Sequence, residues 1–486
     1  MPASVSSCWS GRAADVRAAR VATLVCALAV GGCAGLRGTD LAPSGLPRDQ
    51  DALRRLLVAG QADSALSRLT ASDPVEGDPL LRYLQAAVAA LHSGDGMATA
   101  LLFEAADPLL EERLTPSLSG HALSFVASDR SLAWTPSPTE RLLIPYYAAR
   151  ARLAAGDLEG AAVEARRLSA QLERAADEDD GPRAGLAGAL RLFAGSVFEA
   201  AHERNDALVS YRHAALLLPG MAIDTLPGSP ADSMAELVVL VEQGFVAHRV
   251  PQSLNLVLAP WEGRRLRAGE ATAMSGVTAR VLAAASGPWA ARAGTELFVA
   301  APTECADCDR DRRRDHDDDD HDDEDDDDPY LLRVAWPALR RTAAPGVRVP
   351  AAITTAAGDP CPVFALADVT DGVAADFDAA RGGILARAVL RAAAKYALVR
   401  AAKSEVSEKD ETAGRIVGIV ANAGTALLEQ ADTRSWHLLP DRIIIARLRL
   451  PPGEHRLRLT FSDGSTADLG ALHLAPGITF HSARLW

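Results

Sequence analysis

The stretch of sequence that decides the fold is "RLFAGSVFEAAHERNDALVSYRHAALLLPG", residues 191–220. Its small and large apolar residues are placed so that two helices can pack against each other. Gly195 and Ala207 lack bulky side chains, so two antiparallel helices can approach closely there. The rings of Phe198 and Tyr211 would fill the space beside that close approach. The stretch therefore predicts a helical hairpin.

The spacing of these residues resembles that of a tetratricopeptide (TPR) repeat. The matching positions are Gly195, Phe198, Ala207, Tyr211, Ala214 and Pro219, of which the proline would end the second helix. Weaker copies surround residues 91–106 and 153–168, and His202 stands where a turn glycine is usual. The turns at residues 94, 156 and 202 lie 62 and 46 residues apart, against about 34 in a regular array. We predict interrupted TPR-like α-helical hairpins over residues 49–232, with an unrelated helical bundle as the alternative.

From about residue 233 the sequence changes to short β-branched or alternating runs bounded by Gly and Pro, which predict strands. Two helices interrupt them, at residues 375–403 and 412–430, and together predict a helical hairpin over residues 375–430. The last runs are separated by turns such as "PPG" and "SDGS" and indicate an antiparallel meander. The predicted fold class is α+β, with a β-rich, sandwich-like domain over residues 233–486.

The N-terminus has the pattern of a secretory signal peptide, residues 1–32. Three arginines precede the apolar run "VATLVCALAVGG", which has 12 residues and is shorter than the roughly 20 that span a bilayer. The small pair before Cys33 resembles a bacterial lipobox. That resemblance implies cleavage before Cys33 and acylation of its thiol, with palmitate-type chains, and of its amine. The alternatives are a plain signal peptide or a buried N-terminal helix.

The residues that follow Cys33 suggest where the protein is anchored. Ala34 stands next to the cysteine instead of an aspartate, which resembles the pattern of lipoproteins exported to the outer membrane of diderm bacteria. Residues 33–48 are rich in Gly and Pro and predict a flexible tether. We expect a lipid anchor in the outer membrane, with the body of the protein on the periplasmic face.

Acidic residues are concentrated in "DHDDDDHDDEDDDD", residues 315–328. The chain has a net charge of −14, and this tract contributes −12, so no global field favours nucleic acid. Twelve adjacent carboxylates repel one another, and the tract lacks the turn glycine of a calcium loop. We predict a disordered insertion, residues 303–329, at the tip of a β-hairpin. Loose cation binding, with His316 and His321 taking part, is the alternative.

The remaining chemistry-bearing motifs are few. Cys305, Cys308 and Cys361 could form a disulfide, stay as idle thiols or hold a metal ion, and the sequence leaves these choices open. The sequence contains no nucleophile elbow, no phosphate-binding glycine loop and no H-E-x-x-H motif. We therefore expect no enzyme, no cofactor and no metal site.

The helix predicted at residues 375–403 has a basic strip. Arg387, Arg391 and Lys395 recur at i, i+4 on a face other than the apolar one. The strip is interpreted as a solvated face, and the alternative is a surface for anionic lipid or a protein partner.

Polar side chains are dense in "EQADTRSWHLLPDRI", between a predicted helix and a predicted strand. The residues singled out are Gln430, Asp432, Arg434 and Trp436. Asp432 and Arg434 are expected to lock the turn, which makes this a structural corner. A partner-binding corner is the alternative.

Taken together, the layout resembles one family of bacterial outer-membrane lipoproteins with TPR-like helices and a β-rich domain. The resemblance covers most of residues 50–475 and is most specific in "LARAVLRAAAKYAL" and "EQADTRSWHLLPDRIIIARLRLPPG". It implies architecture and location but no reaction. We expect a protein–protein interaction scaffold, with an unknown partner in cell-envelope assembly or maintenance. An envelope hydrolase with its site in the β-rich domain, or low-affinity cation binding by the acidic tract, is the alternative.

Overall fold

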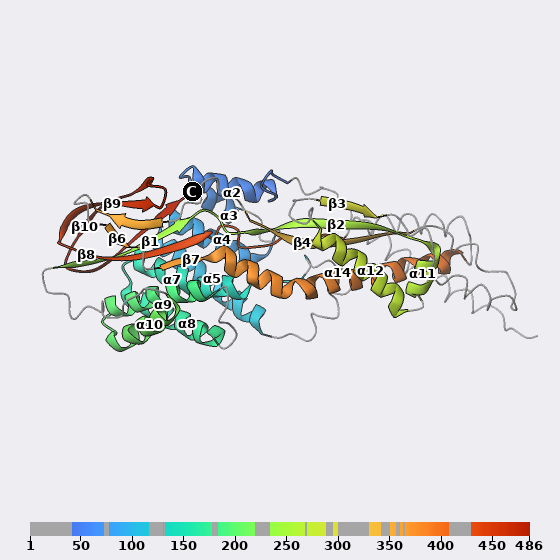
Figure 1. The fold of residues 1–486 in the computed structure, drawn as a ribbon, viewed down its shortest axis with the longest axis horizontal. Helices are drawn as coiled ribbons and strands as arrows, with labels where there is room; N and C mark the ends of the chain where they lie inside the picture. The colour runs from blue at the N-terminus through green and yellow to red at the C-terminus, as the bar shows by residue number, and fades with distance from the viewer. Residues whose placement is uncertain are drawn as a thin grey trace, which may run out of the picture.

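The structure is a computed structural model and describes most of the chain from residue 41 onward (Figure 1). The described residues are 41–71, 77–115, 130, 132–176, 183–218, 234–267, 270–287, 295–299, 330–341, 350–355, 360–362, 365–407 and 429–486. They form an α+β fold, as the sequence predicts. The signal peptide, Cys33, Cys305, Cys308 and the acidic tract lie outside the described residues.

The N-terminal half is helical, and consecutive helices pack as antiparallel hairpins. Its helices are α2 (Arg48–Val58), α3 (Ala62–Ala71), α4 (Pro79–His92), α5 (Gly96–Leu114), α7 (Pro138–Ala154), α8 (Leu158–Ala176), α9 (Ala184–Ala200) and α10 (Arg204–Leu217). The contacting pairs are α4 with α5, α7 with α8, and α9 with α10. Two of the three hairpin turns have glycines in the left-handed region, Gly94 at φ 85° and Gly156 at φ 76°. His202 has φ 63° in the third turn, so it adopts the conformation for which glycine is usual.

The hairpin predicted around Gly195 and Tyr211 forms as expected, from α9 and α10. Tyr211 is 2% exposed, and a methyl group on Gly195 would lie only 2.6 Å from its ring. The Tyr211 hydroxyl donates to Glu199 over 2.7 Å and accepts from Arg447 over 2.6 Å. The ring therefore fills the close approach of α9 and α10 and also joins that hairpin to the β-rich half.

The strands form three sheets, which we name by position. The central sheet has the order β11 (Gly477–Leu485), β1 (Ala235–Gln243), β8 (Arg442–Leu450), β7 (Ala365–Asp368). The outer sheet has the order β10 (Thr466–Leu474), β9 (Gly453–Phe461), β5 (Pro350–Thr354), β6 (Pro360–Pro362). The distal sheet has the order β3 (Thr295–Val299), β2 (His248–Leu258), β4 (Tyr330–Arg340).

The central sheet is the middle layer of the body (Figure 1). Leu237, Val239 and Val241 of β1 pack toward the outer sheet, while Val238 and Leu240 pack toward the helices. Every residue of β1 is buried, because both of its faces are covered. The two sheets share one core, which is the sandwich-like packing expected from the sequence.

The simple meander predicted for the C-terminus is wrong. β8 and β9 follow each other in sequence but belong to different sheets, and β11 pairs in parallel with β1. The "PPG" turn therefore carries the chain from the central to the outer sheet. Only β9 and β10 keep the expected hairpin pairing. One face of β1 is covered by the helices and the other by the outer sheet. A single meander would place all of these strands in one sheet and leave one face of β1 uncovered.

The distal sheet is covered by helices that extend away from the rest of the body (Figure 1). These are α14 (Val369–Ser407), α12 (Ala271–Ser286) and α11 (Pro260–Arg267), of which α11 and α12 were not predicted. The partner helix predicted at residues 412–430 falls mostly outside the described residues, and residues 429–430 are not helical. β3 and β4 both pair with β2 and not with each other. The two strands that flank the acidic tract therefore do not form the expected hairpin with each other.

The predicted tether is ordered where the structure describes it. Residues 41–47 form a turn closed by a bridge between Leu41 and Pro47. Leu46 is completely buried, and the Ser44 carbonyl lies 3.0 Å from Nε2 of His248 on β2. The interpretation of residues 33–48 as one flexible tether is therefore wrong for residues 41–48, because apolar side chains dock them on the body.

The packing of Tyr211 leads to a first prediction. Tyr211→Ala should lower the free energy of unfolding by about 3–5 kcal/mol, because it removes a buried aromatic ring from between two helices. Leu216→Ala on the same helix is the control, since Leu216 is 82% exposed and should change stability by less than about 0.5 kcal/mol. Urea unfolding followed by circular dichroism measures both. A loss of less than about 1 kcal/mol for Tyr211→Ala would contradict the packing.

Candidate functional site

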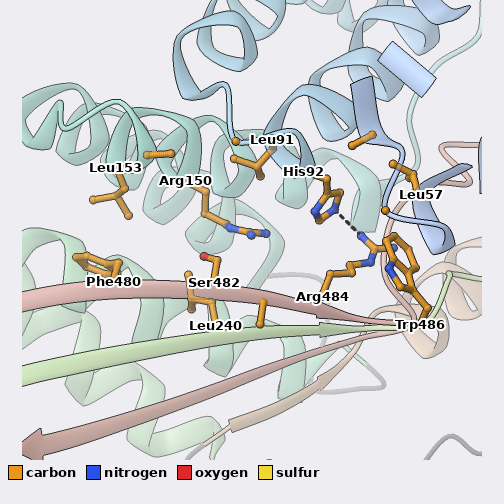
Figure 2. Close-up of a pocket in the computed structure, with 15 residues that line it drawn as sticks. Leu57, Leu91, His92, Arg150, Leu153, Leu240, Phe480, Ser482, Arg484 and Trp486 are labelled. Atoms are coloured by element: carbon orange, nitrogen blue, oxygen red, sulfur yellow. Dashed lines mark hydrogen bonds between the residues drawn. The ribbon is translucent and has the colours of Figure 1, made fainter. Parts of the chain in front are cut away.

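A cavity of about 460 Å³ lies where the helical hairpins meet the central sheet (Figure 2). Its wall is mostly apolar, from Leu57, Leu91, Leu153, Leu240 and Phe480, and its polar lining residues are His92, Arg150, Ser482 and Arg484. Gly60, Gly94, Ser482 and Trp486 line the cavity and are exposed, so they mark its mouth. Leu240 and Arg150 are buried and mark its inner end.

The inner end of the cavity is built around one buried carboxylate. Glu242 on β1 is completely buried and receives three donors from two other elements. The Tyr147 hydroxyl donates over 2.5 Å and Arg484 Nη1 over 3.1 Å, and Arg150 Nη1 donates at closer range. Burial alone would raise the pKa of Glu242, but Arg150, Arg484 and His92 outweigh it and lower that pKa to about 2. The group is therefore a permanent anion that ties α7 and β11 to β1.

His92, at the end of α4, lies beside this carboxylate. Arg484 Nη1 is 3.2 Å from its Nε2 (Figure 2). The same Nε2 is 3.6 Å from Glu242 Oε2. Burial, followed by the charge of Arg484, lowers the pKa of His92 to about 3. The imidazole is therefore neutral, and because Arg484 donates to Nε2 its proton resides on Nδ1.

The charges at the cavity do not balance. Arg150 and Arg484 each pair with Glu242, and within the described part of the chain no other carboxylate pairs with either guanidinium. The Nε atoms of both arginines are buried without a hydrogen-bond partner among the described residues. With His92 neutral, the site holds one positive charge more than its carboxylate compensates.

Aromatic rings hold the Arg484 guanidinium in place. It lies 4.5 Å from the ring centroid of Trp486 and 5.2 Å from that of Phe245. Its Nη2 donates to the carbonyls of Gly244 and Leu438 over 2.9 and 3.0 Å. The cation is therefore oriented on all sides by the protein, which limits its movement.

A second buried polar cluster lies next to the first. Arg54 of α2 donates from Nη2 to the carbonyls of Val246 and His437 over 3.0 and 2.7 Å, and its guanidinium lies 4.7 Å from the Phe245 ring. Burial, followed by the charges of Arg54 and other neighbours, lowers the pKa of His248 to about 3 and that of His437 well below its usual value. Both histidines are therefore neutral in the folded protein.

The predicted corner is built into the interior. Arg434 Nε donates to Asp432 over 2.8 Å, so these two residues lock the turn as expected. Trp436 is completely buried, its backbone N–H donates to Glu140 of α7 over 3.0 Å, and its ring lies 5.8 Å from that of Tyr147. Gln430 accepts from Arg130 over 2.8 Å. These contacts are those of a structural corner that docks the β-rich half on the helices.

The basic strip on α14 is not a solvated face. Arg391 is 1% exposed and donates to Glu429 over 3.0 Å, and Lys395 is buried and pairs with the same carboxylate. Only Arg387 is exposed. The solvated interpretation is wrong because residue 429 returns to α14 and supplies a buried anion, which spacing along one helix cannot reveal. The same burial argues against a lipid-facing strip.

Arg150, Glu242 and Arg484 belong to none of the motifs found in the sequence. A weak signal was present, because Glu242 follows the apolar run "LVVLV" in a strand that reads as buried. A charge in such a run needs a partner. The partners come from residues 150 and 484, which no sequence spacing connects to residue 242. Cys361 lies on β6, but its side chain is outside the description, as are Cys33, Cys305 and Cys308.

Comparisons with family models, with curated proteins and with solved structures give no match to this chain. Within the described residues, no helix is both long and apolar enough to cross a bilayer. The same residues contain no group of three or more His, Cys, Asp or Glu side chains placed to hold a metal ion. The cavity is therefore the site on which a functional argument can be built.

The buried histidines predict a pH dependence of stability. His92, His248 and His437 have lowered pKa values in the folded protein, so below the unfolded value of about 6.5 only the unfolded chain takes up their protons. Stability should therefore be highest above about pH 6.5 and fall as the pH drops toward 3. The slope approaches about 1.4 kcal/mol per pH unit for each histidine, or about 4 for all three.

Urea unfolding at a series of pH values between 7 and 5 measures this slope. His92→Gln should reduce it by about a third, whereas Leu216→Gln, at a position that is 82% exposed and carries no titratable group, should leave it unchanged. A flat profile across this range would mean that the three imidazoles are not held neutral.

Proposed function

We propose that this protein is a lipid-anchored scaffold on the periplasmic face of the outer membrane that binds a protein partner without chemical turnover. The observation that carries the binding role is the mostly apolar cavity with its fixed excess of positive charge. Such a site attracts a ligand, and its ionisable groups are tuned away from proton transfer. Glu242 has a pKa of about 2 and His92 one of about 3, so neither exchanges protons near neutral pH.

The cavity is a better binding surface than the inner faces of the hairpins. In a TPR-like array those faces would line a concave groove, yet α7 and α9 are buried along most of their lengths. Tyr147 and Arg150 of α7 contact Glu242 of the central sheet. The ring centroids of Phe193 on α9 and Phe480 on β11 are 6.4 Å apart. The chain's own sheet thus occupies the groove, and a partner is left with the cavity at its end.

A hydrolase is the second candidate, because Ser482 and His92 line one cavity and the carboxylate of Glu242 lies 3.6 Å from His92 Nε2. In a catalytic triad the imidazole accepts a proton from the nucleophile and donates to the carboxylate. Here Nε2 of His92 faces the Arg484 donor and the carboxylate, and no hydrogen bond joins Ser482 to His92 among the described contacts. A neighbouring cation also weakens the base. This geometry favours binding over hydrolysis.

The position of Cys33 just before the folded body supports the lipid anchor. The lipobox-like residues before Cys33 end only a few residues before position 41, from which the chain is docked on the body. Several acyl chains, each contributing about 0.8 kcal/mol per buried methylene, hold a protein firmly on a bilayer. The resemblance to bacterial outer-membrane lipoproteins supports the same location and a role in cell-envelope assembly or maintenance.

The anchor is tested by Cys33→Ala, which should move the protein from the membrane fraction to the soluble periplasmic fraction. Cys26→Ala, inside the predicted signal peptide, is the matched control and should leave the protein membrane-bound. Fractionation and immunoblotting measure both variants. Membrane association of Cys33→Ala at the level of the control would remove the lipid anchor from the proposal.

The scaffold role is tested by site-specific photo-crosslinking in the native envelope. A crosslinking amino acid in place of Ser482, at the mouth of the cavity, should yield one discrete protein adduct. The same amino acid in place of Leu216, which is 82% exposed on α10, should not yield that adduct. Equal adducts from both positions, or none from residue 482, would contradict partner binding at the cavity.

A further inference from the structure

The strand that lines the cavity has an unpaired edge. β11 pairs with β1 on one side, and among the described strands none pairs with it on the other. The Leu485 carbonyl accepts from the N–H of Gly244, which directly follows β1. Because backbone direction alternates along a strand, the N–H and C=O groups of Phe480, Ser482 and Arg484 point toward the open edge.

The residues with open-edge backbone groups are also those whose side chains line the cavity. Phe480, Ser482 and Arg484 face the helices, and Ser482 points toward Arg150 across the cavity (Figure 2). An extended chain added at this edge would therefore have backbone partners beside an apolar pocket. This combination is the one that β-strand addition uses to recognise peptides.

The charge at the cavity selects which part of a peptide can bind. Arg150 and Arg484 share the single carboxylate of Glu242, so one positive charge is not compensated within the described residues. A monoanion would restore neutrality there, and a carboxylate matches the geometry of guanidinium donors. The terminus of an apolar peptide combines one carboxylate with apolar side chains, which matches the apolar and cationic parts of the lining.

We infer that the cavity captures the C-terminal segment of a partner protein, an extended apolar peptide that ends in a free carboxylate. The peptide pairs its backbone with the open edge of β11, places one or two apolar side chains against Leu57, Leu91 and Phe480, and directs its carboxylate to the guanidinium of Arg150, beside the positive charge of Arg484. This inference rests on the proposed scaffold role and names the chemistry of the partner. A fatty acid shares the anionic head but offers no backbone to β11.

Isothermal titration of the full-length mature protein in detergent tests the inference. The probes are acetyl-Ala-Leu-Val-Val-Leu with a free carboxylate, the same peptide with a C-terminal amide, and laurate. The free acid should bind, and amidation should weaken binding by about tenfold or more, because the amide lacks the charge that the arginines select. Laurate should bind less tightly than the free-acid peptide.

Ser482→Phe fills the mouth of the cavity while Glu242, Arg150 and Arg484 keep their own side chains, and it should abolish binding of the free acid. Leu216→Phe, at a distant exposed position, should leave binding unchanged, and thermal unfolding of both variants checks their fold. Equal affinity for acid and amide, binding that survives Ser482→Phe, no binding of either peptide, or binding of laurate alone would each overturn the inference. The crosslinking experiment at residue 482 is independent of these probes, so an adduct there with no peptide binding would leave the scaffold role standing.

Discussion

The packing of the helices on the central sheet depends on one buried carboxylate. This carboxylate lies on a strand of the central sheet, and its hydrogen-bond donors come from other elements. Glu242 is on β1, and its donors come from α7 and from β11. An isolated buried charge would cost several kcal/mol, so β1 can be buried only if these elements stay together. The same carboxylate thus couples the helical hairpins to the β-rich half, and the buried Trp436 corner adds a second tie between them.

That coupling also shapes the site. Two guanidiniums, one from α7 and one from β11, share this carboxylate and leave an excess positive charge beside a mostly apolar cavity. Because the helices close on their own sheet, the surface that remains for a partner is small and chemically defined. The pKa values of Glu242 and His92 lie well below neutral pH, so neither group exchanges a proton there. The proposed binding role rests on the same contacts that stabilise the fold.

Local patterns predicted the elements well and their assembly poorly. The spacing of Gly195 and Tyr211 predicted the α9–α10 hairpin, and alternation predicted nearly every strand after residue 233, since both depend on neighbours in sequence. The division of β8 and β9 between two sheets, the burial of Lys395 against Glu429, and the meeting of Arg150, Glu242 and Arg484 depend on distant contacts. No single-helix or single-strand pattern encodes those contacts. The lipid anchor remains a prediction from the sequence.

The most direct test of this account is urea unfolding of Glu242→Gln, followed by a helical signal and by the fluorescence of the buried tryptophans. The account predicts that stability falls by about 3–5 kcal/mol, because two buried guanidiniums lose their shared partner. It also predicts that both signals still change in a single transition, because helices and central sheet unfold together. A loss of less than about 1 kcal/mol, with the wild-type helices and sheet unfolding in separate transitions, would contradict it.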